Sequence, residues 1–119
     1  MVKVYANTGR LGLERIELHA PFTRDGKYGW VVMLPDLVNS ADNIEDPIRS
    51  TLLLFEDGER LDPSHALHED IRKLGDGRFS HWAGYLIFST SDNSDPNTNG
   101  RKYVLLGERS IAHGVRIRK

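Results

Sequence analysis

The chain has 119 residues, 39% hydrophobic and 28% charged, a balance typical of one globular domain with a single core. Its net charge of −1 gives no overall attraction to nucleic acid, and its lack of cysteine excludes a disulfide scaffold or a thiolate metal site. The apolar runs are too short for a membrane span, and the N-terminus lacks the apolar core of a signal peptide, which favours a cytoplasmic location.

The first part of the sequence predicts antiparallel strands joined by tight turns. In residues 13–22, Ile16 and Leu18 lie on one face and charged residues on the other, as in a half-buried strand. Residues 28–34 are apolar on both faces, which indicates a central strand with Trp30 in the core. Glycine-containing turn signals separate the strands: Asp25-Gly26, Asp57-Gly58, Asp76-Gly77 and Ala83-Gly84.

Residues 35–50 show no clear period, and a stretch of that length without structure is long for a compact domain. Either this segment carries function, or Leu37, Val38 and Ile44 anchor it to the core. The second reading is the favoured one.

One helix is expected, starting after Asp62-Pro63 with Ser64 as its cap. Leu67, Ile71 and Leu74 recur at helical spacing and predict one buried stripe. Glu69 and Lys73 are spaced to pair on the same helix, and Gly75 can supply its left-handed stop.

The whole chain therefore predicts one β-rich domain over residues 1–119, with seven or eight short strands and one short α-helix. That pattern favours an all-β fold, an antiparallel β-sandwich of jelly-roll type or a barrel, over a parallel sheet. The expected strands cover residues 13–22, 28–34, 51–55, 59–61, 78–82, 85–89, 102–106 and 115–118, and the weakly alternating residues 2–5 could form an edge strand.

The segment from Ser89 to Gly100, called the polar loop below, is longer than a hairpin turn requires. Its side chains supply the hard oxygens that calcium prefers, so calcium is the candidate cofactor, with Asp92 and Asp95 as metal ligands. The spacing is not that of the helix-flanked calcium loop, because the acid at its far end is missing. The same groups could instead bind sugar hydroxyls or cap their own backbone. The residues concerned are Asp92, Asn93, Asp95, Asn97 and Asn99.

Three histidines lie close together in the sequence: His65, His68 and His81. They could hold zinc, with His19 as a further ligand, or serve as acid/base groups with Glu69, Asp70 or Asp92. The simpler interpretation is that His65 serves the helix start, His68 is exposed and His81 makes a hydrogen bond within the sheet. His113 carries no usable signal.

Aromatic and arginine side chains complete the candidate site. By strand alternation Trp82 points to the same side as Ser80 and Arg78, which makes it the best candidate for stacking on a sugar ring, with Tyr85 beside it. Arg78 and Arg101 bracket the segment and could pair with its acids or with an anionic ligand.

Three segments together suggest a family: FEDGERL, HALHEDIRKLGDGRFSHW and FSTSDNSDPNTNGRKY, within residues 55–103. They resemble a small β-domain found in bacterial proteins beside the glycosyltransferase or methyltransferase domains of surface-polysaccharide synthesis. The resemblance implies a β-rich accessory fold and a saccharide context. It brings no catalytic residues that match positions in this chain.

The sequence thus leads to a first hypothesis, a non-catalytic, lectin-like carbohydrate-binding module whose partner is a saccharide. A second hypothesis is a small metal- or His-assisted enzyme acting on a sugar or sugar nucleotide. A third is an interaction domain that pairs through a sheet edge or an apolar patch, including pairing with a second copy of the chain as a homo-oligomer. The ligand-binding candidates are His65, His68, Arg78, His81, Trp82, Tyr85, Asp92, Asn93, Asp95, Asn97, Asn99 and Arg101.

Overall fold

The computed structural model of the protein describes residues 13–108. The expected strands at residues 2–5 and 115–118, and His113, lie outside the described residues. In chain order the elements are β1 (Leu13–Leu18), β2 (Thr23–Asp25), β3 (Gly29–Met33), the 3-10 helix η2 (Pro35–Ser40), β4 (Leu53–Glu56), β5 (Glu59–Arg60), α2 (His68–Lys73), β6 (Phe79–Trp82), β7 (Tyr85–Phe88) and β8 (Tyr103–Glu108).

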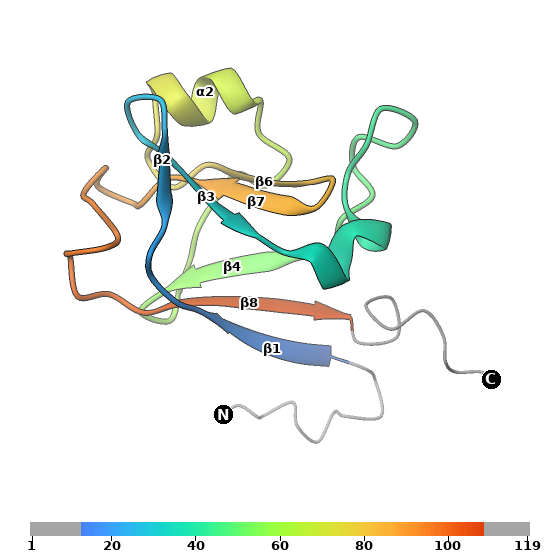
Figure 1. Cartoon of the computed structure of the whole chain (residues 1–119), viewed down its shortest axis with the longest axis horizontal. Coiled ribbons are helices and arrows are strands. Elements are labelled where there is room, and N and C mark those ends of the chain that lie inside the picture. The colour runs from blue at the N-terminus through green and yellow to red at the C-terminus, as the bar shows by residue number, and fades with distance from the viewer. Residues whose placement is uncertain (1–12, 109–119) are drawn as a thin grey trace.

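The eight strands of this part of the chain form two antiparallel sheets that lie one over the other (Figure 1). One sheet has the order β1-β8-β4-β5 and the other the order β2-β3-β7-β6. The expected all-β, sandwich-like fold is confirmed. So is the central position of β3, which pairs with β2 on one side and β7 on the other.

Three of the four glycine turns predicted from the sequence join neighbouring strands of one sheet, whereas Asp76-Gly77 connects α2 to β6. Asp57-Gly58 links β4 to β5, and Ala83-Gly84 links β6 to β7, with Ala83 in the left-handed region at φ 51°. The longer connections, in contrast, carry the chain from one sheet to the other. The polar loop is one of them, since it leaves β7 in one sheet and enters β8 in the other. Its length therefore has a structural cause that a hairpin would not need.

The core lies between the sheets and takes side chains from both. Phe88 of β7 stands edge-on to Phe22, with ring centroids 5.5 Å apart, and lies 5.3 Å from the ring of Tyr103 on β8. Trp30 and Leu54 are buried in the same cluster. Trp30 is therefore a core residue, as expected from its doubly apolar strand.

Helix α2 covers the outer face of the β2-β3-β7-β6 sheet (Figure 1). Two details of the helix prediction are wrong. The helix starts at His68, with no side-chain cap, because residues 62–67 adopt an irregular path that includes His65 at φ 56°. Of the expected stripe only Ile71 is fully buried, since six residues offer less than two turns to the sheet and leave Leu67 71% exposed. The Glu69–Lys73 ion pair and the left-handed Gly75 are present as predicted.

Residues 35–50 are only partly anchored to the core. Leu37 is buried within η2, whereas Val38 and Ile44 are 46% and 83% exposed, so the expectation for those two was wrong. Besides Leu37 and Ala41, the segment buries three polar residues: Ser40, Asp42 and Ser50. The backbone of Asp42 pairs with the β6 edge, where its N–H donates to the carbonyl of His81 and its carbonyl accepts from the N–H of Ala83. The segment therefore covers the edge strand.

Candidate functional site

A hollow of about 360 Å³ lies beside the turn end of the β6–β7 hairpin, between the outer face of the sheet and residues 65–68. That volume is within the range of small-molecule sites in proteins. We call it the aromatic hollow; its lining residues are Asp42, Pro47, His65, Ala66, Leu67, His68, Ser80, Trp82 and Tyr85. Four of the sequence-predicted ligand residues meet here: His65, His68, Trp82 and Tyr85.

The aromatic floor of the hollow follows from strand alternation. Trp82 and Tyr85 are directly opposite each other across the hairpin, and both point away from the core, as Ser80 does two residues earlier. Both rings are half-buried, so each keeps part of one surface accessible. This pair supplies the flat apolar faces that a sugar ring can stack on.

His68 forms one wall and holds the floor in place. Its ring stands edge-on to Trp82 at 5.8 Å and tilted against Tyr85 at 6.0 Å, and its Nε2 lies 3.2 Å from the hydroxyl of Ser80. Burial, together with the nearby charge of Arg72, lowers the pKa of His68, and the carboxylate of Asp25 only partly opposes this shift. His68 is therefore a neutral ring at neutral pH, which fits a positioning role better than a charged one.

A buried carboxylate and a histidine form the polar part of the hollow. Asp42 has a side chain only 2% exposed, and its Oδ2 lies 2.6 Å from Nδ1 of His65. Its Oδ1 accepts a hydrogen bond of 2.7 Å from the N–H of Ser50. The buried carboxylate of Asp42 thus orients the ring of His65, whose side chain is 27% exposed at the wall of the hollow.

His81 faces the opposite side of the sheet and does not line the hollow. Its Nδ1 lies 2.6 Å from the hydroxyl of Ser50. Burial lowers the pKa of His81 to about 4, against the raising effects of the Asp42 charge and the Leu37 carbonyl. Its hydrogen bond ties the 35–50 segment to the sheet.

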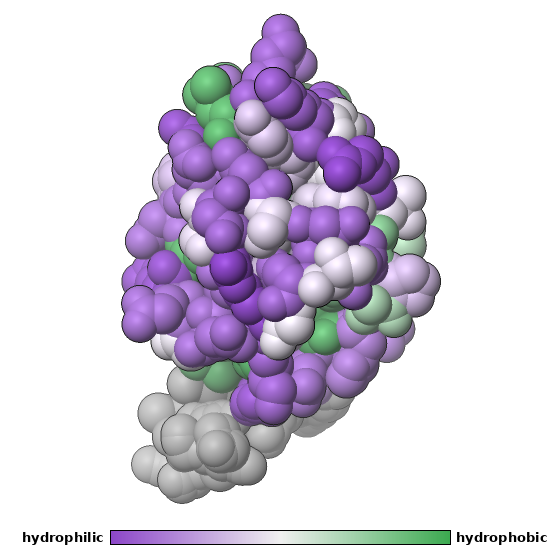
Figure 2. Space-filling view, turned by 90° about the vertical axis from the view of Figure 1, so that its left-hand side faces the viewer, coloured by the Kyte–Doolittle hydropathy of each residue, from purple (hydrophilic) through white to green (hydrophobic). Residues whose placement is uncertain are grey.

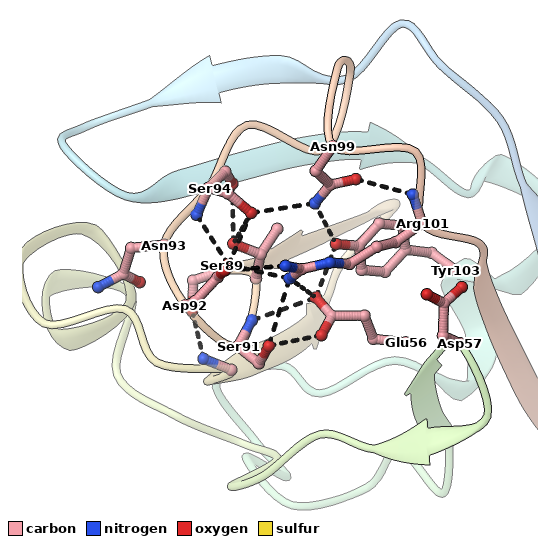
Figure 3. Close-up of polar contacts among 12 residues, drawn as sticks. Glu56, Asp57, Ser89, Ser91, Asp92, Asn93, Ser94, Asn99, Arg101 and Tyr103 are labelled. Carbon is pink, nitrogen blue, oxygen red and sulfur yellow. Dashed lines mark hydrogen bonds and ion pairs between the residues drawn. The ribbon is translucent and has the colours of Figure 1, made fainter.

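The polar loop forms a second cluster, organised around Glu56 at the end of β4 (Figure 3). The side chain of Glu56, 7% exposed, accepts from the hydroxyl and the N–H of Ser91 and from the hydroxyl of Tyr103 at 2.7 Å. Burial favours a raised pKa for Glu56, but these hydrogen bonds and the charge of Arg101 outweigh it and lower the pKa. Glu56 is therefore a buried anion that anchors the loop to the sheet below.

The loop's own acids and amides are also engaged within the protein. Asp92 makes two hydrogen bonds with Arg101, at 2.9 and 2.8 Å, and these, with help from Ser94, lower the pKa of Asp92. The side-chain amide of Asn97 accepts a hydrogen bond from the N–H of Phe22 and donates one to its carbonyl, although Phe22 lies 75 positions earlier in the chain. The remaining contacts join Asn93 to Asp76, Asp95 to the N–H of Asn97, Asn99 to Ser94 and Tyr103, and Arg78 to the carbonyl of Gly75.

The self-capping alternative for the polar loop thus describes its contacts well. Within residues 13–108, no group of three or more His, Asp or Glu side chains is placed to hold a metal ion. The loop leaves β7 at the end opposite to Tyr85, so strand length separates it from the aromatic hollow by roughly 13 Å. It forms part of a predominantly hydrophilic face (Figure 2). The structure therefore divides most of the predicted site residues between the aromatic hollow and the polar loop, and His81 belongs to neither.

Sequence reasoning missed three residues that matter here: Asp42, Ser50 and Glu56. Asp42 lies within residues 35–50 and Ser50 at their end, and this segment has no period, so nothing in the pattern marked either residue as buried. Glu56 precedes the Asp57-Gly58 turn, where an acid normally indicates a solvated residue. Only the pairing of distant segments gives these side chains their partners.

Comparisons with protein-family models, with curated proteins and with solved structures found no match. In the part of the chain that the structure describes, no helix has both the length and the apolar character needed to cross a membrane. The function must therefore be argued from the geometry of the site.

Proposed function

We propose that this protein is a non-catalytic carbohydrate-binding module whose ligand occupies the aromatic hollow. One observation carries the proposal: two accessible aromatic rings, Trp82 and Tyr85, and an oriented polar pair, Asp42–His65, line the same concavity. A sugar ring has apolar C–H faces and a polar rim of hydroxyls, so it needs both kinds of surface at once. The hollow supplies them within the dimensions of a small ligand.

The lining chemistry favours binding over glycoside cleavage. Hydrolysis of a glycosidic bond usually requires two carboxyl groups flanking the scissile bond. Asp42 is the one carboxyl group among the residues that line the hollow, and its side chain is almost completely covered. It can orient His65, but it is not exposed to a ligand.

A second candidate function is a His-assisted enzyme acting on a sugar or sugar nucleotide. The Asp42–His65 pair favours it, because a carboxylate that fixes the tautomer and orientation of a histidine is a recurring way to prepare a general base. Release of sugar or phosphate from a sugar nucleotide by the purified protein, abolished by His65→Asn, would support this candidate against simple binding.

The test of the leading proposal is a glycan-array screen of the labelled protein, run with calcium and with EDTA. Trp82→Ala is expected to weaken every positive interaction by about tenfold or more, because it removes the main stacking surface. Trp82→Phe keeps an aromatic face and is expected to retain part of the binding. Asp95→Ala, in the polar loop, is the matched control and is expected to bind as the unmodified protein does, as is the EDTA-treated sample. Unchanged binding by Trp82→Ala would overturn the proposal.

A further inference from the structure

The charged groups that line the aromatic hollow are of one kind. Its lining, which lies wholly within the described residues, contains the carboxylate of Asp42 and no lysine or arginine. Arg72, whose charge acts on His68, is already held by Asp25 through two hydrogen bonds, at 3.0 and 3.2 Å. The lining therefore offers an anionic ligand a buried carboxylate and no lysine or arginine.

Building on the proposed function, we infer that the hollow selects an uncharged sugar and that the Asp42–His65 pair sets this selectivity. The pair does so through the direction of one hydrogen bond. Because Nδ1 of His65 lies 2.6 Å from Oδ2 of Asp42, which can only accept, the proton of the neutral imidazole belongs on Nδ1. Nε2 then carries a lone pair and accepts a hydrogen bond from a sugar hydroxyl.

Acidic sugars are disfavoured for two reasons that act together. A carboxylate, sulfate or phosphate group has only acceptor oxygens, so it cannot donate to Nε2 of His65. It also places a second negative charge within several ångströms of Asp42, whose side chain is too buried for water to screen it well. Together these effects predict an affinity for an acidic sugar that is roughly tenfold or more below that for its neutral counterpart.

The backbone holds His65 firmly enough for this selectivity. Its φ of 56° is in the left-handed region, which a residue with a Cβ rarely adopts without local support. The support comes from both sides of the residue: the Pro63 carbonyl accepts from the N–H of Phe79, and the N–H of Ala66 donates to the carbonyl of Phe79. His65 is thus fixed against the edge of β6 while its ring reaches the carboxylate of Asp42.

Asp42→Asn tests the inference, because it reverses the hydrogen bond without changing the shape of the side chain. The amide oxygen can still accept from the N–H of Ser50, while the amide nitrogen donates to Nδ1 of His65. The neutral imidazole must then carry its proton on Nε2 and present a donor to the ligand. The same substitution also removes the buried charge. Asp46→Asn is the control, since it changes the net charge equally at an exposed position next to the lining residue Pro47.

The measurement is the ratio of affinities for a neutral methyl hexoside and the matching hexuronide, taken above neutral pH by titration calorimetry. Histidine ¹⁵N shifts report the tautomer of His65 in the same samples. We expect the unmodified protein and Asp46→Asn to prefer the neutral sugar by roughly tenfold or more, and Asp42→Asn to lose most of that preference as the tautomer changes. A role that is merely structural would weaken both sugars equally and leave the ratio unchanged.

Binding of the hexuronide as tightly as the hexoside by the unmodified protein would overturn this inference and leave the proposed function intact. An unchanged ratio in Asp42→Asn, with the tautomer reversed, would overturn it as well. Absence of binding to every sugar would overturn the proposed function itself. If Asp42→Asn does not fold, His65→Asn provides the test, because asparagine tolerates a positive φ. It removes the acceptor at Nε2 and is expected to reduce the ratio, whereas an unchanged ratio would refute the inference.

Discussion

Glu56→Gln is the substitution that most directly probes what holds the polar loop onto the sandwich. The amide oxygen of glutamine can still accept from the hydroxyl of Tyr103 and the N–H of Ser91, and the amide nitrogen can donate to the hydroxyl of Ser91. What disappears is the negative charge that makes these bonds stronger and that pairs with Arg101 at 3.4 Å. Hydrogen bonds to a charged group exceed neutral ones by about 1 kcal/mol, so we expect a loss of about 1–2 kcal/mol in the free energy of unfolding. For a chain of this length that corresponds to roughly 4–8 °C in melting temperature.

Urea unfolding of the two proteins across a range of pH measures this difference and also tests its cause. The pKa of Glu56 is lowered by folding, so its contribution is complete above its unfolded value of about 4.3 and is lost as pH falls through the folded value. The difference in free energy of unfolding between the two proteins should therefore shrink below about pH 4. Glu59→Gln, at the exposed position paired with Glu56 across the hairpin, is the matched control and is expected to change little. The role assigned to Glu56 would be refuted if the two proteins had the same free energy of unfolding, or if their difference stayed constant on acidification.

Three further predictions concern other parts of the structure. Gly26→Ala should lower the free energy of unfolding by at least about 1 kcal/mol more than Gly58→Ala does. The two glycines have nearly the same φ, +83° and +84°, but of the two only Gly26 would bring its new Cβ against another side chain, 2.6 Å from Cβ of Arg72. Equal losses of stability in thermal melts would argue against that close packing. The unmodified protein should lose stability as the pH falls from about 6.5 to about 4, because the unfolded chain binds a proton at His81 in this range and the buried ring does not. His81→Gln should remove this decline. Urea titrations that give the same pH profile for both proteins would contradict the prediction. Calcium should leave the melting temperature unchanged, since the loop carboxylates already accept hydrogen bonds within the protein, and a saturable increase would show that they bind the ion instead.

Much of the fold could be predicted because its strands carry their own signals. Alternation in residues 13–18 and the two-sided apolar run around Trp30 reflect burial on one face or on both, which depends on the strand itself. The glycine turns were equally readable, because a positive φ is a local requirement that few residues meet. The predicted helix was too long. The spacing of Leu67 and Leu74 suggested a continuous buried stripe, which the irregular path of residues 62–67 prevents.

The candidate site was only partly predictable, for a different physical reason. Trp82 could be assigned to the outer face by counting along its strand. The partners of the polar groups could not be assigned, because they come from distant segments: Asp42 lies 23 positions before His65. Likewise, the sequence alone could not tell that the polar loop crosses between sheets and uses its acids and amides to secure that crossing. The division of the predicted residues into a structural cluster and a hollow is therefore a tertiary property.

The central claim is that a sugar binds over Trp82, and the two tryptophans of the chain allow a direct test of it. The measurement is a titration of ¹⁵N-labelled protein with a neutral sugar identified on the array, followed through the two indole N–H signals. We predict a saturable shift of the Trp82 signal and of the amides around residues 65–68, with the signal of the buried Trp30 unmoved as an internal reference. Shifts confined to the polar loop, or a Trp82 signal that does not move at saturation, would contradict the account.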